Sequence, residues 1–261
     1  MNTTIVTAFI DLYKHDAKYK NKSLRQYLHF GNKLIQLPIP KIVFIEEHLM
    51  HLLSKNEMTK FIPVNFDHIW LMNRHNEMQM KTDHLRQISP EKDTTSYLIL
   101  NLNKTEWTHI ASEANPYNTQ QFMWLDFGVY HICNDEDVMT RNIFKACRTV
   151  CLKNKNKIYI PSCQPTSKVD MRILDQYSNP NFFLKFPCWF FCGGTFIGHR
   201  LAITMFRDRV RALTEYMLSK VAITWEVNVW FLIFREFPQL FHVLYGANHN
   251  QNMLEPYTSL I

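Results

Sequence analysis

A carboxylate at the end of an apolar run is the first feature of this sequence that suggests chemistry. The run extends from Phe122 to Leu125, Asp126 follows it directly, and Gly128 stands two residues further on. Because a buried strand would deliver this carboxylate to its own end, the charge must there be solvated, paired or bound to a cation. Two interpretations are open: Asp126 binds a metal ion, or it closes the strand in a turn that Gly128 assists.

Polar side chains also follow the other apolar runs, and they supply further candidates for a site. They are Thr7, Asp11, Glu46, Ser162 and the cluster Asn248-His249-Asn250. A carboxylate and an imidazole on neighbouring strand ends could share a divalent cation, and oxygen ligands with one imidazole suit Mn²⁺ better than Mg²⁺. Such an ion could neutralise a diphosphate leaving group. His131 is nearer to Asp126, but it continues the apolar strand that we expect over 122–132.

These residues must be positioned by an alternation of strands and helices. Apolar, β-rich runs predict strands within 3–12, 40–49, 122–132, 157–162, 189–198 and 241–250. Helical spacing and capping residues predict helices over 23–37, 96–113, 134–152, 199–221 and 224–237, whereas 74–93 lacks a clear period and is expected to be a loop. This order favours one α/β domain, 1–261, with a mixed, mostly parallel sheet flanked by helices. Ligands of such sheets bind outside the carboxyl ends of the strands.

The composition limits the classes of ligand and partner that the protein could bind. The chain has 261 residues, 46% of them hydrophobic, and 29 basic against 23 acidic residues give a net charge of +6. This modest excess favours an anionic ligand such as a nucleotide, or loose contact with a membrane surface, and lacks the clustered basic stripe of a nucleic-acid-binding protein. No apolar stretch approaches the roughly 20 residues of a membrane span, and no basic n-region precedes an apolar signal segment. We therefore expect a cytoplasmic protein.

The stretch NPYNTQQFMWLDFGVYHI, residues 115–132, resembles the signature of the HtrL/YibB-like family, which is assigned to the glycosyltransferases. Looser similarity extends over IVTAFIDL, KIVFIEE, GGTFIG, WEVNVW and the closing LYGANHN. The resemblance implies a GT-A-type fold, a Rossmann-like sheet that binds a nucleotide sugar and a divalent cation. Residues 1–132 would be the nucleotide-binding half and 133–261 the acceptor-side half.

The resemblance also implies a metal centre. Asp126 matches the first acid of an Asp-x-Asp element, near the ribose and the metal, and His249 matches the histidine that completes the metal shell. Gly128 stands in the third place of that element, where a second acid is expected. This departure leaves the cation short of one ligand.

Other positions acquire binding roles from the same resemblance. Thr7, Ala8 and Phe9 lie where such enzymes seat the base, and Trp124 precedes the acid. Lys104 would meet the phosphates, or else it is a solvated helix lysine.

Two further segments lie on the side of the sugar and the acceptor. Gly193 and Gly194 would line this side, unless they form an ordinary hairpin. Trp225 is a candidate for stacking on a sugar face, and Asn228 for a polar contact with the acceptor; Trp230 is better explained as core.

Glu226 is the candidate for a catalytic base, because an inverting transferase needs a carboxylate within reach of the acceptor hydroxyl. Its place in the first turn of a helix also has a structural explanation through the helix dipole. We thus expect transfer of a hexose from a nucleotide sugar, a UDP-sugar above all, to a hydroxyl of a glycan, a lipid-linked saccharide or a protein. The alternative is a catalytically silent nucleotide- or sugar-binding module that lost the second acid.

Overall fold

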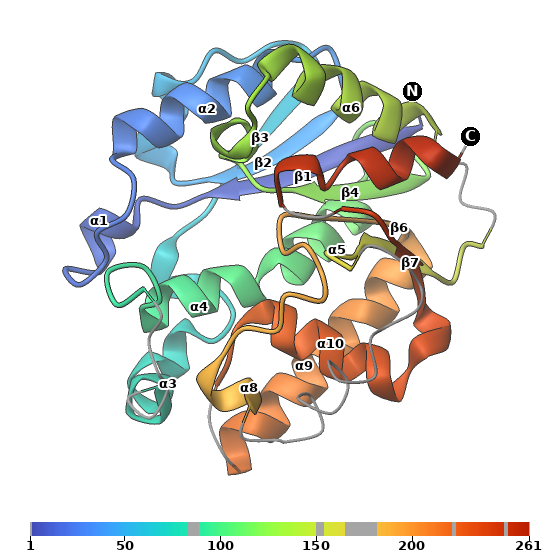
Figure 1. The fold of residues 1–261 in the computed structure, drawn as a ribbon. Coiled ribbons are helices and arrows are strands. Elements are labelled where there is room, and N and C mark those ends of the chain that lie inside the picture. The colour runs from blue at the N-terminus through green and yellow to red at the C-terminus, as the bar shows by residue number, and fades with distance from the viewer. Residues whose placement is uncertain are drawn as a thin grey trace.

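Seven strands form one mixed sheet between two layers of helices in the computed structural model (Figure 1). The structure describes residues 2–82, 89–149, 154–164, 182–220, 223–247 and 250–260. The strands are β1 (Thr3–Phe9), β2 (Lys41–Ile45), β3 (Thr59–Pro63), β4 (Gln121–Leu125), β5 (Ile158–Pro161), β6 (Thr195–His199) and β7 (Phe241–Leu244). Their order is β3-β2-β1-β4-β6-β5-β7, and β6 runs antiparallel to both of its neighbours, β4 and β5.

Helices cover both faces of the sheet. The α-helices are α1 (Leu12–His15), α2 (Leu24–Gln36), α3 (His75–Thr82), α4 (Thr95–Leu102), α5 (Lys104–Ala114), α6 (Glu136–Thr149), α8 (Phe182–Lys185), α9 (Arg200–Lys220) and α10 (Glu226–Glu236). Short 3-10 turns are η1 (Glu47–Leu52), η2 (Phe66–His68), η3 (Met72–Arg74), η4 (Val129–Ile132), η5 (Pro238–Leu240), η6 (Asn250–Asn252) and η7 (Glu255–Leu260). Helices α2 and α6 lie on one face of the sheet, and α4, α5, α9 and α10 lie on the other (Figure 1).

Alternation along the strands builds a separate hydrophobic core on each face. Val6 and Trp124 belong to the core under α4, α5, α9 and α10, whereas Ile5 and Met123 belong to the core under α2 and α6. Both faces of the central strands are therefore buried, as a mostly parallel sheet requires. The predicted α/β domain with a mixed, mostly parallel sheet is confirmed.

Helix α2 shows the predicted capping chemistry. Ser23 accepts a hydrogen bond from the backbone N–H of Gln26, and the Gln26 side chain accepts one from the backbone of Ser23. This capping box satisfies two of the donors that a helix start leaves open. The expected helix over 23–37 is confirmed, with Ser23 as its N-cap.

Two predicted boundaries differ from the structure. The expected helix over 96–113 divides at Asn103, whose side-chain amide donates to the carbonyl oxygens of Ile99 at 2.8 Å and Trp70 at 2.9 Å. Such an amide competes with the helix backbone, which explains the division. The expected strand over 122–132 ends at Leu125, since the carbonyl oxygen of Asp126 accepts from Val129 N at 3.0 Å and begins a turn.

Other differences follow from tertiary contacts. The segment 74–93, expected to be a loop, contains α3, and the edge strand β3 was not predicted at all. Residues 189–198 contain β6 but not a hairpin, because β6 pairs with β4 and β5 instead. Thr224 does not cap α10: its hydroxyl donates to the carbonyl oxygen of Phe183, and Trp225 takes the N-cap position. None of the described helices combines the length and apolarity needed to cross a membrane.

Candidate functional site

Three strands bring their ends to one place. β1 and β4 are parallel neighbours, so Phe9 and Leu125 end at the same edge of the sheet. Because β6 is antiparallel to β4, its first residue, Thr195, pairs with Leu125 at that edge. The backbone N–H of Asp126 then donates to the carbonyl oxygen of Gly194 at 3.0 Å. The sequence element around Asp126 is thereby joined to the Gly193-Gly194 loop.

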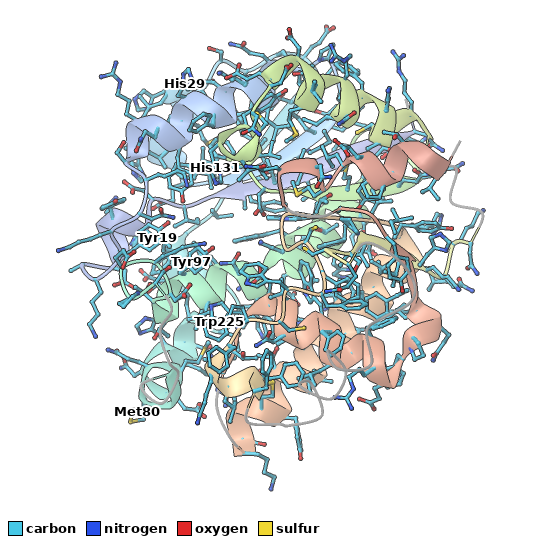
Figure 2. The ribbon with its side chains drawn as sticks, in the orientation of Figure 1. Tyr19, His29, Met80, Tyr97, His131 and Trp225 are labelled. Carbon is cyan, nitrogen blue, oxygen red and sulfur yellow. The ribbon has the colours of Figure 1, made fainter. Side chains whose placement is uncertain are left out.

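A cavity of about 240 Å³ opens at this edge. Its wall includes the end of β1, the first turn of α5, the loop after β4 and the two glycines before β6. Tyrosines form much of one side; the rings of Tyr19 and Tyr97 stack with centroids 6.0 Å apart (Figure 2). Aromatic walls with a few convergent polar groups are typical of small-molecule sites.

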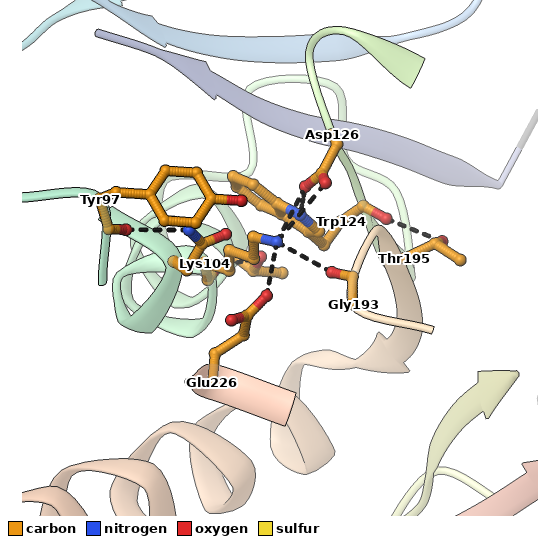
Figure 3. Close-up of polar contacts among 9 residues, drawn as sticks. Tyr97, Lys104, Trp124, Asp126, Gly193, Thr195 and Glu226 are labelled. Atoms are coloured by element: carbon orange, nitrogen blue, oxygen red, sulfur yellow. Dashed lines mark hydrogen bonds and ion pairs between the residues drawn. The ribbon is translucent and has the colours of Figure 1, made fainter. Parts of the chain in front are cut away.

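Lys104 is the centre of the polar part of the cavity. It lies at the start of α5, with a side chain only 6% exposed. Its Nζ donates to the carbonyl oxygen of Gly193 at 2.9 Å and to Oε1 of Glu226 at 3.0 Å, and it lies 3.2 Å from Oδ1 of Asp126 (Figure 3). Three distant segments therefore converge on one ammonium group. The alternative of a solvated helix lysine is wrong.

Electrostatics keep this ammonium charged. Burial alone would lower the pKa of Lys104, but the carboxylates of Asp126 and Glu226 outweigh burial and raise that pKa above its ordinary value. The positive charge in turn compensates two carboxylates that share a small volume.

Asp126 is the most open member of this cluster. Its side chain is 40% exposed, and Oδ1 accepts a hydrogen bond from Nε1 of Trp124 at 2.8 Å. The Trp124 ring is itself held by the Trp107 ring, stacked at 5.9 Å. The carboxylate is thus fixed from behind while it faces the cavity.

Glu226 is the buried partner, with a side chain 10% exposed at the start of α10. Its Oε1 accepts a hydrogen bond from Nζ of Lys104, and in the described part of the chain no donor reaches Oε2. Gly193 lies close to the start of α10, since a Cβ there would be 2.9 Å from Oε1 of Glu226 and 3.1 Å from Cγ1 of Val227. A glycine at position 193 thus allows the loop to pass close to the start of α10.

The described donors do not by themselves form a divalent-cation site. Asp126 is engaged by Trp124 and Lys104, Gly128 offers no side-chain ligand, and among the residues described no three His, Cys, Asp or Glu side chains gather as metal ligands. His249, the second expected ligand, lies outside the described residues.

The other expected contacts fall into two groups. Ala8, Phe9, Trp124, Gly128 and Gly194 line the cavity together with Lys104, Asp126, Gly193 and Glu226. Thr7 does not: its side chain is fully buried between the strand and the core, so the hydroxyl that we expected beside a base is absent from the wall. Ala8 and Phe9 are the last two residues of β1 and reach the cavity, whereas Thr7 lies further inside the sheet.

The residues expected to contact the sugar or acceptor also differ from prediction. Trp225 and Asn228 are buried and do not line the cavity, whereas Trp230 is buried in the core as expected. The Asn228 amide instead donates to the carbonyl oxygens of Phe183 and Phe186, both at 2.9 Å. These residues build the core beside the site.

The remaining polar strand-end candidates have clear positions. His131 lies in η4, not in a strand, and lines the cavity with Nδ1 2.5 Å from the carbonyl oxygen of Gly128. Glu46 is buried behind the wall, where it accepts from the backbone N–H of Asp11 at 2.8 Å and contacts Nε2 of His15 at 2.6 Å. Ser162 is buried and donates to a backbone carbonyl.

Sequence reasoning missed one side of the cavity. Tyr19 and Lys22 lie within residues 13–22, where the sequence is polar and lysine-rich and predicts no helix or strand. Tyr27 lies in the expected helix over 23–37, and Lys92 and Tyr97 line the same cavity. The interleaving of tyrosine with lysine over residues 13–27 was the available signal, because aromatic and basic side chains together are typical of nucleotide-binding surfaces.

Fold and site together define an α/β protein with a polar and aromatic cavity at the carboxyl edge of its sheet. The particular family is given by the sequence: residues 1–251 match the HtrL_YibB model, described as a bacterial protein of unknown function, and the chain belongs to this family. No match was found among curated protein sequences.

Two solved structures are similar over most of the chain. Mouse xyloside xylosyltransferase 1 in its apo form is 12% identical, with a TM-score of 0.39, over 93% of this chain and 84% of that one. The 4-diphosphocytidyl-2C-methyl-D-erythritol synthase of Anaerococcus prevotii is 9% identical, with a TM-score of 0.39, over 98% of this chain and 96% of that one. Similarity at this level does not identify the activity of this chain.

Proposed function

We propose that this protein is a glycosyltransferase of GT-A type that binds a nucleotide sugar, a UDP-sugar first of all, in the cavity beside Asp126. The observation that carries the proposal is the buried Lys104, whose ammonium ties the two candidate acids, Asp126 and Glu226, to one end of the cavity. Charged groups gathered and desolvated in a cleft are typical of functional sites.

The nucleotide would lie along the sheet edge. Ala8 and Phe9 offer a small residue and a flat ring at the end of β1, and the Phe9 ring stacks on Phe127 at 4.8 Å. Asp126 lies at the end of the adjacent strand β4, within reach of a ribose or of the sugar. This arrangement follows the rule that ligands of open α/β sheets bind at the carboxyl ends of adjacent strands.

Glu226 would act as the base in a direct displacement. Its Oε2 takes the proton of the acceptor hydroxyl, and the hydroxyl oxygen forms a bond to the anomeric carbon. The bond from that carbon to the diphosphate oxygen breaks, and its electron pair leaves with the nucleoside diphosphate. Lys104 donates to Oε1 of Glu226 and so fixes the carboxylate with its other oxygen, Oε2, available to the acceptor hydroxyl. The acceptor would be a hydroxyl of a glycan, a lipid-linked saccharide or a protein.

A divalent cation, Mn²⁺ rather than Mg²⁺, stays a prediction. Asp126 is the only predicted ligand among the described residues, and its Oδ1 already faces Lys104 and Trp124. The cation would need His249 or ligands from the substrate.

Donor hydrolysis tests the proposal. Incubation with a panel of UDP- and GDP-sugars, with and without Mn²⁺, should release sugar slowly from at least one donor, and Asp126→Ala should abolish that release. The variant should keep its far-UV circular dichroism and its unfolding midpoint within a few degrees, because the side chain is 40% exposed. Full activity of Asp126→Ala would contradict the assigned site.

The silent binding module is favoured by one observation, the missing carboxylate at Gly128. This alternative predicts that nucleotides bind in the same cavity and that no donor of the panel is turned over.

A further inference from the structure

Two lysines at the cavity come from segments far apart in the sequence. Lys22 lies between α1 and α2, Lys92 lies just before α4, and both line the cavity. The two segments are joined directly, since the backbone N–H of Lys20 donates to the carbonyl oxygen of Glu91 at 2.6 Å. Both lysines therefore reach the same opening from two segments that are joined to each other.

Neither ammonium is paired with a carboxylate in the described part of the chain. The contacts that they make are with rings of the cavity wall. Nζ of Lys22 lies 6.0 Å from the centroid of the Tyr27 ring, and Nζ of Lys92 lies 5.2 Å from that of Tyr97. These weak contacts leave the ammonium hydrogens available to an acceptor.

The two charges also oppose one another. Burial lowers the pKa of Lys22, and the charge of Lys92 lowers it further. Two like charges in a partly dehydrated place cost free energy, and an anion bound between them removes that cost.

The charge of the whole wall points to the same conclusion. Among the described lining residues, Lys104 stands against three carboxylates, those of Asp11, Asp126 and Glu226. Lys104 is already bound to three acceptors and cannot balance all of this charge. Without Lys22 and Lys92 the wall would be negative and would repel a phosphate anion; with them its formal charge is zero.

We propose that Lys22 and Lys92 clamp a diphosphate from two sides and supply the positive charge that the donor set around Asp126 does not obtain from a complete metal site. The ligand class is a pyrophosphate or a nucleoside diphosphate. That this diphosphate is the one in the nucleotide-sugar donor rests on the proposed function. The neighbouring hydroxyls of Tyr19 and Tyr27, 3.0 Å apart, and the Asn21 amide are neutral groups beside the same phosphates. Lysine suits this task, because its flexible chain carries a compact charge to either oxygen.

Titration calorimetry of pyrophosphate and of UDP, each with EDTA present, tests the clamp. Lys22→Met and Lys92→Met should each weaken pyrophosphate binding about tenfold or more, as expected for lost hydrogen bonds to a charged group. Lys22→Arg and Lys92→Arg should retain binding, which shows that charge is responsible and not a change of fold. The matched control is Lys14→Met with Lys18→Met, which removes the same charge from exposed side chains that do not line the cavity.

The outcomes separate the two proposals. Equal pyrophosphate affinity in the Lys22→Met/Lys92→Met variant and in the control variant would overturn the clamp, whether or not UDP binds. Lysine-dependent pyrophosphate binding in a protein that does not bind UDP would support the clamp and contradict the proposed donor. Lysine-dependent binding of both ligands supports the clamp and agrees with the proposed donor.

Discussion

Removal of the Lys104 ammonium should destabilise the protein strongly. In Lys104→Met the length and apolar volume of the side chain are nearly kept, but Glu226 is left with a carboxylate that is 10% exposed and has no cation beside it. Breaking a buried pair from one side costs about 3–5 kcal/mol. The more exposed Asp126 adds about 1 kcal/mol or less. We therefore expect the free energy of unfolding to fall by about 3–6 kcal/mol in total.

The assay is urea unfolding followed by tryptophan fluorescence at pH 7, on the wild type, Lys104→Met, Glu226→Gln and the double variant. Glu226→Gln removes the stranded charge, so it should restore most of the stability of Lys104→Met although it lowers that of the wild type.

A small effect would refute this reasoning. If Lys104→Met loses less than about 1 kcal/mol, the pair is not buried as described. If the double variant is no more stable than Lys104→Met, the loss is due to packing and not to charge.

Two further predictions concern the packing at Gly31 and the buried Lys41. Gly31→Ala should lower the free energy of unfolding by about 1–3 kcal/mol, because its Cβ would lie 2.0 Å from the Phe127 ring. Gly128→Ala, whose Cβ would have nothing nearer than 3.4 Å, should change that free energy by about 0.5 kcal/mol or less in the same urea experiment. Equal stability of the two variants would contradict the packing around Gly31. Burial lowers the pKa of Lys41 to about 8. Between about pH 8 and the ordinary pKa of lysine, the unfolded chain therefore binds more protons than the folded protein. The stability of the wild type relative to Lys41→Met should then rise with pH over that range. A flat difference in urea midpoints from pH 7 to 10 would contradict a buried, shifted lysine.

The sheet was predictable where sequence carries a local signal. The apolar run before Asp126 and the capping box at Ser23 identify β4 and α2 without tertiary information. β3 was missed because Thr59–Pro63 is short and only partly buried at the edge of the sheet. Local pattern finds central elements and loses edge elements, whose burial depends on the rest of the fold.

The site was predictable only in part. Asp126 follows its strand, and its position could be inferred from the sequence alone. The contact between Lys104 and Glu226 joins residues 122 positions apart, and no spacing rule reports such a pair. Thr7 was expected at the end of its strand, but β1 extends to Phe9, and an apolar run does not fix the exact residue at which a strand ends. Lys22 and Lys92 were missed because their loops have no regular period.

A crystal structure of the protein soaked with UDP and Mn²⁺ tests the central claim most directly. We predict that the base lies against Ala8 and Phe9, the ribose near Asp126, and the diphosphate within hydrogen-bond distance of Lys22 and Lys92. Nucleotide bound away from the carboxyl ends of β1 and β4, or an empty cavity at millimolar UDP, would contradict it.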